Sequence, residues 1–168
     1  MPFTPFHFGP SASIALPLRR YIDIPIFILA NVVVDIEPLT VMVFNLRYPL
    51  HGYIHTFIFG SLAGILFAFF SYIFRRPIER FMQRVLYMEY KFHLPRAILS
   101  GALGICFHIL LDSPLYFDIK PFYPLKANPF LDMFSSLEVY LACGFVFVPA
   151  VWMYWRLRGR GKERYIQM

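Results

Sequence analysis

Four of the five histidines in this sequence of 168 residues lie in or beside apolar segments. His51 and His55 are four residues apart, and His108 and Asp112 repeat that spacing later in the chain. Residues at i and i+4 share one face of a helix, so each pair is expected to present two polar groups in one direction. Ionisable groups are costly among apolar residues that cross a bilayer, and their presence there indicates function.

Three further residues extend this set. Asp35 and Glu37 interrupt a second apolar run, and His7 precedes a short one. Imidazole and carboxylate groups bind Zn²⁺, or Mn²⁺ and Fe²⁺ where oxygen ligands dominate. We therefore predict a site for one or two ions, most simply zinc, with the ligands His7, Asp35, His51, His55, His108 and Asp112.

The catalytic residues expected at such a site are Asp35 and Glu37. Glu37 is the candidate general base, because a carboxylate beside a metal can accept a proton from water. An equally simple interpretation is that Glu37 caps a helix break next to Pro38.

Composition indicates the fold class. The chain is 58% hydrophobic and 15% charged, with a mean hydropathy of +0.56, whereas soluble domains carry about 25% charged residues. We expect an all-α integral membrane protein that forms a single domain over residues 1–168. The net charge of +6 comes from cations beside hydrophobic segments, which indicates topology signals and contacts with membrane lipids. No nucleic-acid-binding motif is present, so we expect no nucleic-acid partner.

Four apolar runs are long enough to span a bilayer, which takes about 20 residues. The predicted transmembrane helices are 22–44, 49–74, 96–113 and 135–155. Residues 8–18 are too short to span and predict an N-terminal re-entrant half-helix. Residues 77–92 are basic and aromatic, which predicts a helix on the cytoplasmic membrane surface, and residues 156–168 form a basic tail. Small residues at Gly60, Gly64, Gly101 and Gly104 predict close helix packing.

The basic segments orient these spans. By the positive-inside rule, Arg19 and Arg20, residues 75–96 and the C-terminal tail are expected on the cytoplasmic side of an inner membrane. The predicted ligands then meet in the outer half of the bilayer. The outer loop 115–134, rich in aromatic residues and proline, is expected to cover them. No part in the site is expected of the charged residues of this loop, which are Asp118, Lys120, Lys126 and Asp132.

The order of the ligands resembles a family of uncharacterised bacterial and archaeal inner-membrane proteins described as membrane-bound metal-dependent hydrolases. The resemblance covers residues 1–116 and rests on four short elements: "TPFHFG", "VVDIE", "HGYIHT" and "HILLD". It departs from the family pattern at Val34, which replaces proline, at Glu37, which replaces aspartate, at Gly52, which replaces arginine, and at Thr56, which replaces serine. The missing arginine weakens any expectation of phosphate recognition at that position.

The ligand order is also similar, more faintly, to that of zinc-dependent phospholipase C. The later histidine ligands of those enzymes have no counterpart here, because no histidine follows His108. Together the two resemblances imply hydrolysis of a lipid or another phosphoester by metal-activated water. Two other functions remain open: a non-enzymatic membrane protein with a structural metal or polar cluster, and a transporter of ions or protons. The sequence does not indicate an oligomeric state.

Overall fold

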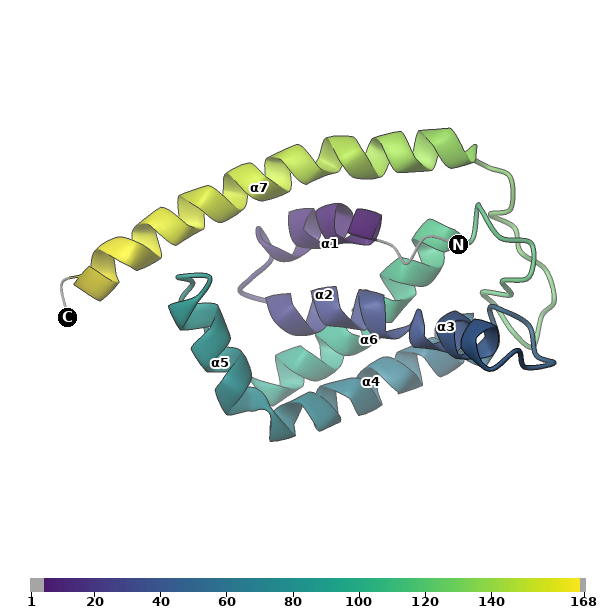
Figure 1. Ribbon diagram of the computed structural model, residues 1–168, viewed down its shortest axis with the longest axis horizontal. Helices are drawn as coiled ribbons and strands as arrows, with labels where there is room; N and C mark the ends of the chain where they lie inside the picture. The colour runs from purple at the N-terminus through teal and green to yellow at the C-terminus, as the bar shows by residue number, and fades with distance from the viewer. Residues whose placement is uncertain (1–4, 167–168) are drawn as a thin grey trace.

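The computed structural model describes residues 5–166, and the regular secondary structure of this part of the chain is all helical (Figure 1). A 3₁₀ turn, Pro5–His7, leads into α1, and a second 3₁₀ turn, Tyr53–His55, precedes α4. The α-helices are α1 Phe8–Ala15, α2 Ile24–Val33, α3 Ile36–Val43, α4 Phe57–Ile73, α5 Arg75–Arg84, α6 Leu94–Asp112 and α7 Ser136–Ile166.

Three helical stretches within the described residues are long and apolar enough to cross a membrane. They are Ile24–Val43, Leu94–Asp112 and Ser136–Arg158. A fourth candidate is α4 together with α5, two helices that meet at a bend of 79°. The prediction of an all-helical protein with several helices long and apolar enough to span a membrane is therefore confirmed.

Helices α4 and α6 are in close backbone contact where two glycines meet. A Cβ atom added to Gly64 would lie 2.2 Å from the Gly101 carbonyl oxygen, far inside van der Waals contact. A Cβ atom added to Gly104 would lie 2.6 Å from the Phe27 carbonyl oxygen of α2, which is also too close. Small residues thus allow three helices to approach one another, as the glycine pattern predicts.

The predicted span 22–44 is two helices, with the break at Val34 and Asp35. An uninterrupted helix would press the ring of Pro38 against the carbonyl of Val34 and leave that carbonyl without its usual donor. The break separates α2 from α3, and at this point Asp35 lies 3.4 Å from His108 of α6 and Glu37 lies 2.8 Å from His55.

Several predicted helix boundaries are wrong. The span 49–74 was expected to begin at Pro49, but α4 begins only at Phe57, where the Thr56 hydroxyl caps it by accepting a hydrogen bond from the Phe59 N–H at 3.3 Å. The surface helix expected over 77–92 is helical only as far as Arg84. The segment after it is held by side chains of α5 instead; for example, Glu79 accepts a hydrogen bond from the Phe92 N–H at 2.9 Å.

Helix α1 is enclosed by other elements, while α7 lies at the edge of the molecule. In Figure 1, α7 arches over α1, and α1 separates it from α2 and the α4–α6 pair. The re-entrant segment predicted over 8–18 is an eight-residue helix followed by turns. The last helix passes its predicted end at residue 155 and continues to Ile166, so the described part of the basic tail is helical.

A buried polar contact holds the opposite end of the molecule from the loops. Asp23 caps α2, and its carboxylate accepts a hydrogen bond from the Tyr90 hydroxyl, which lies 2.9 Å from both oxygens. Its backbone N–H donates to Ser100 of α6 at 2.7 Å. Burial raises the pKa of Asp23, and the Tyr90 hydroxyl works against that rise.

Candidate metal centre

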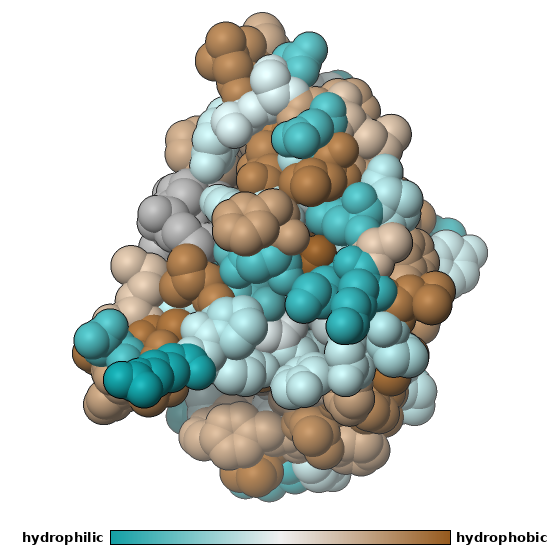
Figure 2. Space-filling view, turned by 90° about the vertical axis from the view of Figure 1, so that its right-hand side faces the viewer, coloured by the Kyte–Doolittle hydropathy of each residue, from teal (hydrophilic) through white to brown (hydrophobic). Residues whose placement is uncertain are grey.

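The polar residues singled out in the sequence gather near the loop end of the helices. The loop after α3, the loop between α6 and α7 and the break between α2 and α3 all meet here (Figure 1). Figure 2 looks onto this end and shows polar residues across the middle of the face, with apolar residues above and below them.

His55 is held by a carboxylate from α3. Its Nδ1 lies 2.8 Å from Oε2 of Glu37, and the His55 side chain is fully buried. Glu37 also accepts hydrogen bonds from the backbone N–H groups of Gly52, at 3.1 Å, and Ile54, at 3.3 Å. Both carboxylate oxygens are therefore engaged, and the imidazole donates through Nδ1, which leaves the lone pair on Nε2.

His51 is held in the same way from the other side. Its Nδ1 lies 2.8 Å from Oδ1 of Asp118, and its backbone N–H donates to Oδ2 at 3.1 Å. The imidazole packs on the ring of Tyr116, with 4.6 Å between ring centroids. Burial and the nearby carboxylate of Asp112 raise the pKa of Tyr116 above its ordinary value.

The C-terminal end of α6 adds a second group of contacts. Asp112 lies between two imidazoles, with Oδ1 3.2 Å from Nε2 of His7 and Oδ2 3.2 Å from Nε2 of His108. The same His108 nitrogen lies 3.4 Å from Oδ1 of Asp35. The two His108 contacts do not have hydrogen-bond geometry, and this buried nitrogen has no hydrogen-bond partner among the described residues.

These two groups form one cluster. The ring centroids of His55 and His108 are 5.6 Å apart, those of His51 and His55 4.7 Å, and those of His7 and His108 4.5 Å. Each of the six predicted ligands is at most 6% exposed. Among the residues that the structure describes, the buried Nε2 atoms of His51, His55 and His108 have no hydrogen-bond partner. Such groups are costly unless something binds them.

The arrangement fits a metal ion. Ligand atoms of Asp35, His55 and His108 lie within 4.8 Å of one another. Two ligands of one tetrahedral zinc ion are about 3.4 Å apart, because each is about 2.0–2.2 Å from the ion. The separations of 3.2 and 3.4 Å between His108 and its two carboxylates already match that value. The donor set is also chemically suitable for zinc.

The prediction that each histidine pair shares one helical face is correct for His108 and Asp112 but wrong for His51 and His55. His51 lies in a loop and His55 ends a 3₁₀ turn. The backbone N–H groups of this segment donate to Glu37 and Asp118, so the segment is stabilised by tertiary contacts rather than by a helical ladder.

Sequence reasoning missed Asp118. Its place in a loop predicts no role in the site, yet it contacts His51 through both carboxylate oxygens. The available signal was its position: it is an acid in the loop expected to cover the site. The other charged residues of that loop include Lys120, which lines a small cavity of about 150 Å³ with His51 and Asp118.

A larger cavity lies on the α7 side of the cluster. It measures about 700 Å³, and its walls are almost entirely apolar. Leu111 and Pro114, which flank Asp112, line it together with Pro10 of α1 and Cys143 of α7. The small cavity therefore reaches the cluster at His51, whereas the apolar groove is lined by sequence neighbours of Asp112 and not by Asp112 itself.

Comparisons with known proteins give no match. No protein-family model matches the chain, and neither the curated proteins nor the solved structures contain a significant match. What is established is an all-helical chain with three to four candidate membrane spans and a buried group of Asp35, His55 and His108 suited to a metal ion.

Proposed function

We propose that this chain is an integral membrane metal-dependent hydrolase whose substrate is a lipid or another amphiphilic phosphoester. The observation that carries the proposal is the pair of histidines His51 and His55. Each is fixed through Nδ1 by a carboxylate, and each keeps a buried Nε2 that has no hydrogen-bond partner within the described part of the chain. Carboxylate–imidazole pairs of this kind are typical of metal ligands, because the carboxylate sets the tautomer and the ring orientation.

The residues have distinct roles in this proposal. Asp35, His55 and His108 hold the ion, and His7, His51 and Asp112 complete its surroundings or hold a second ion. Glu37 orients His55 and is no longer assigned the role of general base, because the Glu37 carboxylate already accepts three hydrogen bonds. A bound zinc ion would lower the pKa of water to about 7 and polarise the ester that is cleaved.

An amphiphilic substrate fits the surroundings of the cluster. The groove of about 700 Å³, lined by Leu111 and Pro114 near Asp112 in the sequence, suits an acyl chain. The small cavity that His51 and Lys120 line suits an anionic headgroup. If the basic segments are cytoplasmic, this end of the molecule lies in the outer half of an inner membrane.

A structural metal site is the second candidate. It is favoured by one observation, namely that none of the six predicted ligands is more than 6% exposed. A structural site has a closed set of protein ligands, whereas a catalytic site keeps a position for water or substrate.

Turnover separates the two candidates. Zinc-loaded protein in detergent would be assayed with a chromogenic phosphodiester and with phospholipids, beside His55→Ala and, as a matched control, His93→Ala. His93 is an exposed histidine before α6. We expect zinc-dependent hydrolysis by the wild type and the His93 variant and none by the His55 variant. Bound zinc without turnover, together with a large loss of thermal stability on chelation, would instead support the structural site.

A further inference from the structure

A second apolar groove lies away from the metal centre, between α1, α2, α5 and α7. Its volume is about 590 Å³, within the range of about 300–1,000 Å³ found for ligand pockets. One face of α1 forms a wall through Phe8, Ala12 and Leu16, which are spaced four residues apart. The groove therefore follows α1 from the end next to the metal centre toward the end next to the basic residues.

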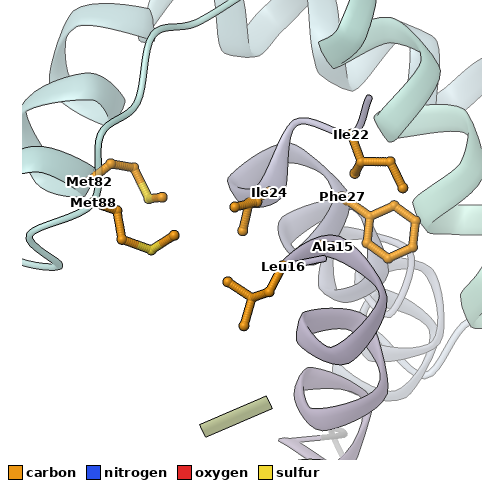
Figure 3. Close-up of a cluster of buried hydrophobic side chains, with 7 residues drawn as sticks. All are labelled: Ala15, Leu16, Ile22, Ile24, Phe27, Met82 and Met88. Carbon is orange, nitrogen blue, oxygen red and sulfur yellow. The ribbon is translucent and has the colours of Figure 1, made fainter. Parts of the chain in front are cut away.

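The end of the groove next to Leu16 is lined by flexible side chains. Figure 3 shows Met82 and Met88 on one side, pointing toward Leu16 and Ile24 on the other. All four of these residues line the groove. Methionine is unbranched and adapts to irregular ligands, so this end can accommodate a flexible hydrocarbon chain.

The basic end of the groove adjoins a smaller cavity of about 180 Å³, and Leu16 lines both. Arg19 and Arg156 line the smaller cavity. Within the part of the chain that the structure describes, neither arginine pairs with a carboxylate; Arg156 instead lies over the ring of Trp152 at 4.0 Å. Two cations beside one cavity repel each other unless an anion binds between them.

We propose that this groove binds one anionic glycerophospholipid, with an acyl chain along α1 and the phosphate between Arg19 and Arg156. Both parts of the surface match that ligand: apolar walls for the chain and two uncompensated guanidinium groups for the phosphate. A second copy of the chain would bring the same positive charge to the basic end, which disfavours it as the occupant. The proposal is independent of the metal centre and its chemistry.

Native mass spectrometry of delipidated protein tests the proposal. The protein would be titrated with phosphatidylglycerol or with phosphatidylcholine, beside the double variants Arg19→Gln/Arg156→Gln and Arg76→Gln/Arg80→Gln. The second pair removes the same charge from exposed positions on α5 that do not line the groove. We expect the wild type to prefer phosphatidylglycerol, the groove pair to bind it about tenfold to thirtyfold more weakly, and the α5 pair to bind it within twofold of wild type.

Equal weakening of phosphatidylglycerol binding by the two double variants would show only a general effect of charge and would overturn the proposal. Equal binding of phosphatidylglycerol and phosphatidylcholine by the wild type would also overturn it. A third variant, Ala12→Phe, fills the groove without changing charge and is expected to reduce phosphatidylglycerol binding at least as much. Circular dichroism on each variant separates loss of binding from loss of fold. Should Ala12→Phe unfold, the charge pair alone decides the outcome.

Discussion

Replacement of Glu37 by glutamine tests whether carboxylates orient the histidines of the metal centre. The carboxylate accepts from His55 Nδ1 at 2.8 Å, from the Gly52 N–H at 3.1 Å and from the Ile54 N–H at 3.3 Å. A glutamine side chain has one acceptor oxygen and one NH₂ group, so in either orientation at least one of the three donors faces another donor. The negative charge that holds the His55 tautomer is also lost.

The expected effect is a metal affinity about 10–100-fold weaker, which is the usual cost of removing such a partner and corresponds to about 1.4–2.8 kcal/mol. The assay is a zinc titration in detergent against a chelating dye of known affinity. Glu138→Gln is the matched control, because Glu138 is exposed at the start of α7 and bonds only to Ser135 among the described residues. A folded Glu37→Gln protein that binds zinc within twofold of the control would refute the orienting role.

Two further predictions concern stability. Gly64→Ala would place a methyl group 2.2 Å from the Gly101 carbonyl oxygen. It is expected to lower the free energy of unfolding by at least about 1–3 kcal/mol, the usual cost of overpacking. The control Gly144→Ala has open space around the new methyl group and is expected to be neutral or stabilising in thermal melts. Tyr90→Phe removes the hydrogen bond to Asp23 and is expected to cost about 1.5–3 kcal/mol at pH 7. Because this bond favours the ionised carboxylate, the cost of the Tyr90 change should shrink as the pH falls through the raised pKa of Asp23; a cost that stays constant with pH would contradict this.

The sequence predicts much of the helical framework, because apolar length and close-packing glycines are local signals. The span expected at 96–113 is α6, Leu94–Asp112, and the one expected at 135–155 begins at Ser136 as α7. The continuation of α7 to Ile166 differs from the prediction, because the polar residues after 155 mark the end of the apolar span but not the end of the helix. Arginine and lysine are good helix formers, so polarity alone does not end a helix.

The candidate site was predictable in its residue types but not in its local structure. A spacing of four residues is compatible with a helix or with a turn, and long-range contacts decide between them. For His51 and His55 those contacts come from Asp118 and Glu37, which are distant in the sequence. The role of Asp118 depends on how the outer loop folds back over the cluster, and no periodicity in the sequence encodes that.

Metal content is the measurement that tests the central claim most directly. Protein purified in detergent, stripped and then reconstituted with zinc would be analysed by inductively coupled plasma mass spectrometry, beside His55→Ala, His108→Ala and the control His93→Ala. The account predicts about one or two zinc ions per chain in the wild type and the control, and a large loss in the His55 and His108 variants. A wild type that remains metal-free, or folded His55 and His108 variants that keep the wild-type content, would contradict it.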